Sequence, residues 1–248
     1  MNDPFVIAAL IGIAFTLAGF VKGVLGMGLP TVAMGLLGLL MPPAAAAAML
    51  IVPSFVTNIW QLFAGPKFLV LLRRLAGMML MVLVGVALSF RVLTGDSSAL
   101  ASAALGVILA LYGVVGLVAR KFTVSRRAER WLSPLVGLIT GLITGATGIF
   151  VIPVVPYITS LELARDELIQ ALGIAFTIST IALGTALVVS GKFQFASAGG
   201  SLLAVIPALA GMAIGQRLRS KLEPAVFRRW FFVGLIMLGL YMFGKAVI

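Results

Sequence analysis

The chain has 248 residues, of which 62% are hydrophobic and only 10% are charged. A soluble domain carries about 25% charged residues, so this composition excludes an ordinary soluble enzyme, a disordered chain and a porin-like barrel. Apolar stretches of about 20 residues, long enough to cross a bilayer, alternate with short clusters of charge. The sequence therefore predicts an all-α integral membrane protein with several spans.

Residue types that carry catalysis are missing or badly placed. Cysteine and histidine are absent, so neither a disulfide, a thiolate nucleophile, a zinc site nor a haem site can be built. The carboxylates all lie outside or at the edges of the apolar stretches, at Asp3, Asp96, Glu129, Glu162, Asp166, Glu167 and Glu223. We therefore expect no catalytic residue, metal, cofactor or enzyme activity. We also expect no carboxylate proton relay at the bilayer midplane.

The net charge of +11 does not predict a nucleic-acid partner. Basic residues beside apolar spans are what the positive-inside rule produces. The chain begins with Met1-Asn2-Asp3-Pro4 and has no basic segment there, so the apolar run from Phe5 is expected to be a retained span rather than a cleaved signal.

Eight apolar stretches follow one another along the chain. They run over about 5–41, 44–64, 75–90, 98–119, 132–160, 168–190, 196–216 and 230–248. The first and the fifth are too long for one span and are interrupted by glycine and proline. We therefore expect that neither 22–42 nor 141–156 forms one continuous helix.

The two interrupted stretches resemble each other and suggest an internal repeat. Gly28 and Gly148 are 120 positions apart, and Phe55 and Phe176 in the following helices are 121 apart. We therefore predict a first membrane repeat over 1–119, a basic cytoplasmic linker over 120–131 and a second membrane repeat over 132–248.

The basic clusters predict the orientation of the spans. Residues 67–74, 120–130 and 217–229 hold 13 of the 18 basic residues, so all three segments are expected in the cytoplasm. The count of crossings between the last two must be even, so 132–160 crosses the membrane either twice or not at all. It is then a hairpin of two shorter helices or a re-entrant pair, turning at its glycines. The halves then have opposite orientations, and both termini are periplasmic.

The predicted fold is two inverted-topology repeats, each a Gly-broken helix hairpin plus three transmembrane helices, an arrangement typical of secondary transporters. A plain bundle of eight spans with one misplaced basic loop is the alternative.

Broken helices within a bilayer favour ligand binding. The unpaired backbone groups need protein or water around them, and a half-helix N-terminus attracts anions. Leu29-Pro30 after Gly28 has the sequence of such a helix start. The candidate substrate contacts at the two breaks are Gly26, Gly28, Thr144, Gly145 and Gly148. Glycines that only pack helices together are the alternative.

Polar residues at helical spacing mark two further helices. Ser54, Thr57, Asn58 and Gln61 lie on one face of the first. The second carries Gln170, Gly173, Thr177, Thr180 and Gly184. We expect Asn58 and Gln61 to share a polar cavity with Thr177 and Thr180, unless these side chains only join helices.

Lys22 is the one cation beside a glycine break. An ammonium group there would attract an anion, so Lys22 is a candidate substrate-binding residue. The alternative is a lysine whose charge reaches the membrane surface at a helix end.

The paired glycine-rich stretches, Gly23 to Pro30 and Gly141 to Pro153, resemble those of the sulfite exporter TauE/SafE family of membrane permeases. Each is followed by an apolar run and an alanine-containing helix start, Ala44-Ala45 and Leu163-Ala164. The resemblance covers nearly the whole chain, although the second break, Gly145-Ala146-Thr147-Gly148, has fewer glycines than is usual in the family.

The resemblance implies transport of small anions such as sulfite, sulfonates, sulfoacetate and related organic acids across the bacterial inner membrane. We therefore predict a secondary transporter that works by alternating access, with a small anion and the lipid bilayer as its partners. The alternatives are an uncoupled anion channel or facilitator and a non-transporting membrane scaffold. The direction of transport and the oligomeric state, a homo-oligomer included, stay open.

Overall fold

The computed structural model describes residues 3–63, 65–95, 97–118, 122–193 and 198–247. Its helices are α1 (Pro4–Leu25), α2 (Leu29–Leu37), α3 (Pro43–Leu62), α4 (Phe68–Thr94), α5 (Ser98–Val118), α6 (Arg126–Thr147), α7 (Val154–Thr159), α8 (Arg165–Val189), α9 (Ala198–Leu203), α10 (Val205–Leu218) and α11 (Pro224–Val247). No strand occurs within these residues. The predicted all-α class is confirmed.

Seven stretches of helix are long and apolar enough to cross a membrane. They lie in α1, α3, α4, α5, α8, the α9–α10 segment and α11. Large apolar side chains on these helices point outward, among them Leu88 and Trp230, each 70% exposed. An apolar outer surface of this extent suits lipid rather than water. The protein is therefore a multi-pass helical membrane protein.

Both interrupted stretches are broken where the sequence predicts. Helix α1 ends at Gly26, with φ 77°, and α6 ends at Gly148, with φ 75°. This left-handed conformation costs other L-residues free energy but is open to glycine. Three residues separate α1 from α2, and 148–153 separate α6 from α7. Neither 22–42 nor 141–156 is a continuous helix.

Several helix boundaries of the first half recur in the second half at an offset of 122 positions. Helices α1 and α6 both have 22 residues. Their first residues, Pro4 and Arg126, are 122 positions apart, and so are their last residues, Leu25 and Thr147. The same step joins the starts of α3 and α8, at Pro43 and Arg165. Gly148 therefore corresponds to Gly26. The sequence pattern had paired Gly148 with Gly28 instead.

Helix packing follows the same correspondence. Helix α1 packs along α10 and α6 along α4, while α3 packs along α8 and α5 along α11. If each helix is replaced by its counterpart in the other half, the α1–α10 pair becomes the α6–α4 pair. The α3–α8 and α5–α11 pairs are then unchanged, because each joins two corresponding helices. Glycines make the contacts close, since a Cβ on Gly19 would lie 2.0 Å from the Ala208 carbonyl oxygen and one on Gly141 2.3 Å from that of Val82.

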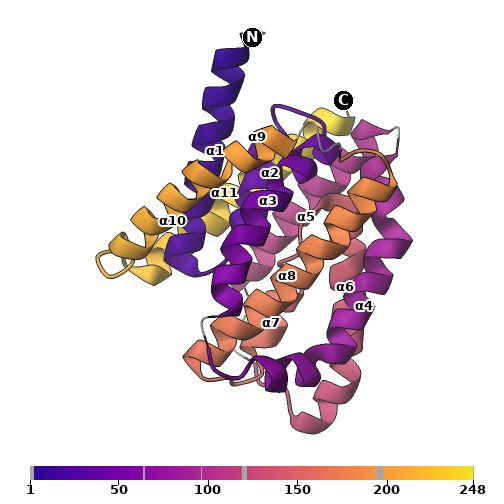
Figure 1. Ribbon diagram of the computed structural model, residues 1–248, viewed down its shortest axis with the longest axis vertical. Helices are drawn as coiled ribbons and strands as arrows, with labels where there is room; N and C mark the ends of the chain where they lie inside the picture. Colours follow the sequence, from indigo (N-terminus) through magenta and orange to yellow (C-terminus); the bar gives the residue numbers. More distant parts are fainter. Residues whose placement is uncertain (1–2, 64, 96, 119–121, 194–197, 248) are drawn as a thin grey trace.

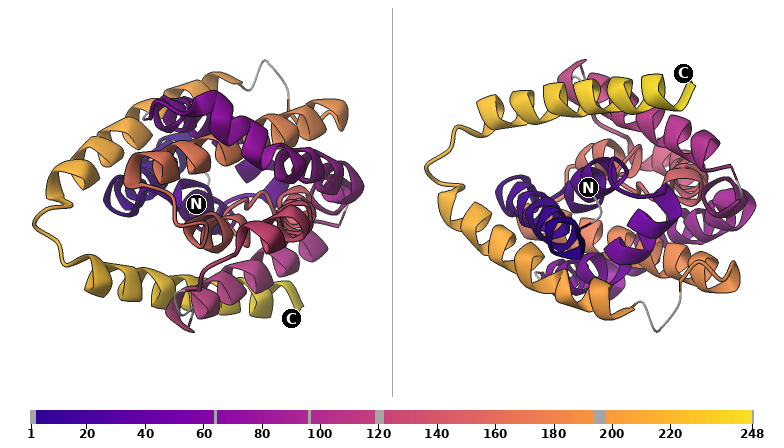
Figure 2. Two further views of the ribbon diagram at one scale, coloured as in Figure 1. Left: turned by 90° about the horizontal axis from the view of Figure 1, so that it is seen from below. Right: turned by 90° about the horizontal axis from the view of Figure 1, so that it is seen from above.

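The two hairpins start from opposite ends of the molecule. Helix α1 starts at the end that holds both termini, whereas α6 starts at the end where the α3–α4 and α7–α8 connections lie (Figure 1). Helices α10 and α11 diverge from their connection at 219–223 along opposite flanks (Figure 2). The inverted orientation of the halves across a membrane stays a prediction.

Helix α6 begins at Arg126, within the segment 120–131 that the sequence analysis assigns to the linker. Ser125 explains this start, because its hydroxyl oxygen accepts a hydrogen bond from the Ala128 backbone N–H and caps the helix. The second hairpin therefore carries basic residues in its first turn.

Candidate functional site

Lys22 is buried in the last turn of α1, directly before the first break. Its residue surface is only 3% exposed. The Nζ atom donates hydrogen bonds to Thr57 Oγ1 at 3.0 Å and to Asn58 Oδ1 at 2.5 Å, both on α3. The ammonium group therefore points into the protein and does not reach the membrane surface.

The polar face of α3 joins Lys22 to the break and to the second half. Ser54, Thr57, Asn58 and Gln61 are all buried there. Gln61 Nε2 donates to the Gly26 carbonyl oxygen at 2.7 Å, which satisfies a backbone group left open by the end of α1. Asn58 Nδ2 donates to Thr180 Oγ1 on α8 at 3.2 Å. Five predicted site residues are thus linked: Lys22, Gly26, Asn58, Gln61 and Thr180.

The Asn58–Thr180 hydrogen bond joins corresponding positions of the two halves. The two residues are 122 positions apart, which is the offset that relates α1 to α6. The polar cluster therefore sits where α3 and α8, the matching helices of the halves, cross.

Lys22 brings a basic amine into this cluster, and no group of opposite sign bonds to it among the described residues. The salt bridges among the described residues are Lys67–Glu167 and Arg74–Glu129. An ammonium group has three N–H donors, and the two bonds of Lys22 go to neutral oxygens. Since burying an unpaired charge is costly, this arrangement favours an anion as the missing partner.

The second break is built differently from the first. Thr144, which corresponds to Lys22, donates to the Thr140 and Ile149 carbonyl oxygens at 2.7 and 3.3 Å. The residues after Gly148 are apolar and buried, beginning with Ile149 and Phe150 at 0% exposure. The backbone groups and the hydroxyl here largely satisfy one another.

The other predicted contacts have no hydrogen bond to the Lys22 cluster among the described residues. A Cβ on Gly145 would lie 2.2 Å from Ser89 Oγ on α4, so this glycine permits helix packing. Gly148 lies against Met34 and Gly28 against Val21 and Phe231. Thr177 donates to the Gly173 carbonyl oxygen of its own helix. The polar cavity that Asn58 and Gln61 are expected to share with Thr177 and Thr180 stays a prediction.

Several buried hydroxyl groups that were not predicted as site residues lack hydrogen-bond partners within the described residues, and two of them lie on α2 and α3. Ser54 Oγ on α3 and Thr31 Oγ1 in the first turn of α2 have no hydrogen bond within the described part of the chain. Ser54 lies one turn before Thr57 and Asn58, on the face that meets Lys22. Helix α2 begins without a side-chain cap. Ser54 thus offers a neutral donor on the same helix face as the residues that bond to Lys22.

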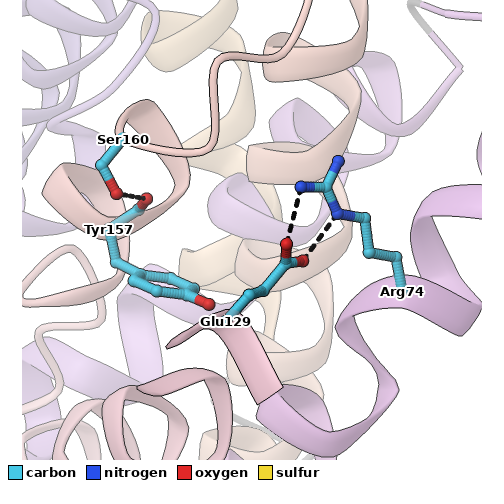
Figure 3. Close-up of polar contacts among 4 residues, drawn as sticks. All are labelled: Arg74, Glu129, Tyr157 and Ser160. Atoms are coloured by element: carbon cyan, nitrogen blue, oxygen red, sulfur yellow. Dashed lines mark hydrogen bonds and ion pairs between the residues drawn. The ribbon is translucent and has the colours of Figure 1, made fainter. Parts of the chain in front are cut away.

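A second polar cluster joins α4 to α6. Arg74 Nε and Nη2 donate to the two carboxylate oxygens of Glu129 at 2.6 and 2.8 Å. Figure 3 shows this two-bond pair, with Tyr157 of α7 beside Glu129. The sequence offered no pattern linking these positions. Glu129 lies at the edge of its apolar stretch, as expected, but it is buried.

A cavity of about 430 Å³ reaches the first break. Met27 and Tyr112 line its inner part, and exposed Glu162 and Arg228 line its outer part. Tyr112 approaches the Met27 sulfur, with an O–S distance of 3.6 Å. The cavity thus connects the region of the basic connections with the residue between Gly26 and Gly28.

Long apolar helices around a pair of helices broken by glycine have the architecture of a membrane transport protein. Residues 10–242 match the family model described as Sulfite exporter TauE/SafE. The chain belongs to this family of membrane transporters, which confirms the resemblance. No curated protein and no solved structure matches the chain.

Proposed function

We propose that this protein is a secondary transporter for a small anion, a sulfite, a sulfonate or a related organic acid, in the bacterial inner membrane. The observation that carries the proposal is Lys22, a buried cation whose hydrogen bonds go only to the neutral side chains of Thr57 and Asn58. Family membership supports the class of substrate.

Alternating access fits the position of this cluster. Lys22, Asn58 and Thr180 are each at most 3% exposed, as expected of an occluded site rather than an open pore. The Asn58–Thr180 bond connects the two halves, so rocking of one half against the other would open the cluster to one side and then to the other. A scaffold would have no need of a buried, unpaired ammonium group.

The basic connections give the proposed orientation. The α3–α4 connection and the start of α6 lie at the end opposite both termini (Figure 1). Basic residues are concentrated in these segments, so the positive-inside rule assigns that end to the cytoplasm. Both termini are then periplasmic. The cavity between Met27 and Arg228 is the proposed cytoplasmic route to the first break. A reporter fused to the C-terminus that is active only in the periplasm tests this orientation.

Flux of labelled sulfite into proteoliposomes tests the function. We expect uptake that saturates, that responds to an imposed proton gradient and that is accelerated when unlabelled sulfite is preloaded on the far side. Saturation and acceleration by preloading distinguish a carrier from a channel. Flux equal to that of protein-free liposomes would contradict the proposal and favour the scaffold.

A further inference from the structure

The net charge of the Lys22 cluster restricts what it can bind. The side chains that bond to Lys22 or continue the cluster are Thr57, Asn58, Gln61 and Thr180, and all are neutral. The corresponding position in the second half is Thr144, which donates to backbone oxygens. The repeat therefore duplicates the backbone break without duplicating the charge.

The cavity that reaches the break does not alter this balance. Its charged lining residues, Glu162 and Arg228, have opposite signs and are both exposed. Charges in that position are screened by solvent, whereas the Lys22 ammonium group lies within the protein. Among the described residues, the cluster thus has one side chain that can carry a positive charge, Lys22.

A buried site is most favourable when its total charge is zero. An anion with one negative charge would neutralise Lys22, and the unpaired hydroxyl of Ser54 could share in binding its oxygens. A dianion would leave one negative charge in a medium of low dielectric constant, where an uncompensated charge is strongly unfavourable. Neutral donors reduce that cost but do not supply the missing charge.

We propose that the site selects anions with a single negative charge and binds them through Lys22 Nζ. This inference rests on the proposed transport function and adds a charge rule to it. Bisulfite and organic monosulfonates satisfy the rule, whereas the sulfite dianion, sulfate and sulfoacetate do not. The rule follows from the absence of a second cation at the position of Thr144.

Two matched probes test the rule on the full-length protein. Methanesulfonate carries one negative charge and methanedisulfonate two, with the same sulfonate group and one carbon atom in each. Each probe competes with labelled sulfite for flux into proteoliposomes, and its binding to the detergent-solubilised protein is measured by calorimetry. We expect methanesulfonate to bind at least about tenfold more tightly than the disulfonate.

Three variants connect the preference to Lys22. Lys22→Met should abolish methanesulfonate binding, whereas Lys192→Met, which removes the same charge from an exposed position, should not change it. Asn58→Asp retains the lysine and places a carboxylate at the atom that now accepts its hydrogen bond. That internal counter-ion should also abolish binding, and it remains a test if Lys22→Met fails to fold.

The outcomes separate the charge rule from the proposed function. Lys22-dependent transport with equal or tighter binding of the disulfonate would overturn the rule and leave the transporter in place. Unchanged methanesulfonate binding in Asn58→Asp would also overturn it. Labelled sulfite flux absent from the wild-type protein would overturn the proposed function itself.

Discussion

The two glycine breaks share a backbone and differ in chemistry. Gly26 and Gly148 end helices of equal length in the same left-handed conformation. The backbone N–H of Gly26 donates to the Lys22 carbonyl oxygen, and that of Gly148 donates to the Thr144 carbonyl oxygen. At the first break that residue is a buried cation bonded to another helix. At the second it is a threonine bonded to nearby backbone oxygens.

The charges of the two hairpins also lie in different places. The second hairpin has Glu129 in its first turn, paired with Arg74. The corresponding position of the first hairpin is Ile7, an exposed apolar residue. The repeated backbone therefore reflects what the fold requires, and the differences locate what function has added. A glycine break by itself does not identify a binding site.

The largest loss of stability is expected at Gly19 of α1 and Gly141 of α6, where each helix packs closely against its neighbour. Gly19→Ala and Gly141→Ala should each destabilise the protein by about 3 kcal/mol, because the new Cβ would overlap a backbone carbonyl oxygen of the neighbouring helix. Gly12→Ala is the control, since nothing lies within 4 Å of its added Cβ. Thermal unfolding in detergent measures all three. A Gly19→Ala variant as stable as Gly12→Ala would contradict the packing.

The Arg74–Glu129 pair is a feature of the second hairpin alone. Glu129→Gln should destabilise the protein by about 2 kcal/mol, because it leaves a half-buried guanidinium group without its charged partner. Glu167→Gln removes the partner of the more exposed Lys67 and should have little effect. Equal unfolding temperatures for the two variants would mean that the buried pair adds no stability.

The helix ends themselves can be compared by single methyl groups. Gly26→Ala and Gly148→Ala should each cost about 1 kcal/mol, because alanine disfavours a positive φ. Gly148→Ala should cost more, since its Cβ would lie 3.1 Å from Met34 Cε whereas that of Gly26 meets open space. Unfolding of both variants side by side tests the order. The reverse order would contradict the close contact between Gly148 and Met34 and the open space beside Gly26.

The smallest effect is expected at the acidic α7–α8 connection. Combined Glu162→Gln, Asp166→Asn and Glu167→Gln changes should leave the pH profile of sulfite flux unchanged. Glu162 lies in the α7–α8 connection, and Asp166 and Glu167 lie in the first turn of α8. This end of the molecule is opposite both termini (Figure 1), so we expect the proton to travel on the substrate as bisulfite. Flux measured against pH decides this, and a flattened profile would assign the coupling to these acids.

Much of the helical arrangement could be predicted because composition and spacing act locally. Glycine and proline within long apolar stretches identified both breaks, and period-3.6 spacing identified the polar face of α3. The register of the repeat was wrong by two residues. The spacing Gly19, Gly23, Gly26 recurs as Gly141, Gly145, Gly148 and would have given the offset of 122.

The site was predicted only in part because its contacts are not local. Asn58 and Gln61 were found from their helical face, but the hydrogen bond from Lys22 to Asn58 spans 36 positions without a sequence pattern. Gly145 has the same residue type as Gly26 but contacts a helix instead of the polar cluster. Likewise, nothing in the sequence connects Arg74 with Glu129. Residue type identified candidates, and three-dimensional packing separates them.

The most direct test of the account compares the corresponding residues at the two breaks. Methanesulfonate binding to the purified protein is measured by calorimetry for the wild type, Lys22→Met and Thr144→Val. Binding should be lost in Lys22→Met and should change less than about threefold in Thr144→Val, because the basic side chain is present only at the first break. Binding that survives in Lys22→Met, or that is lost equally in both variants, would contradict the central claim.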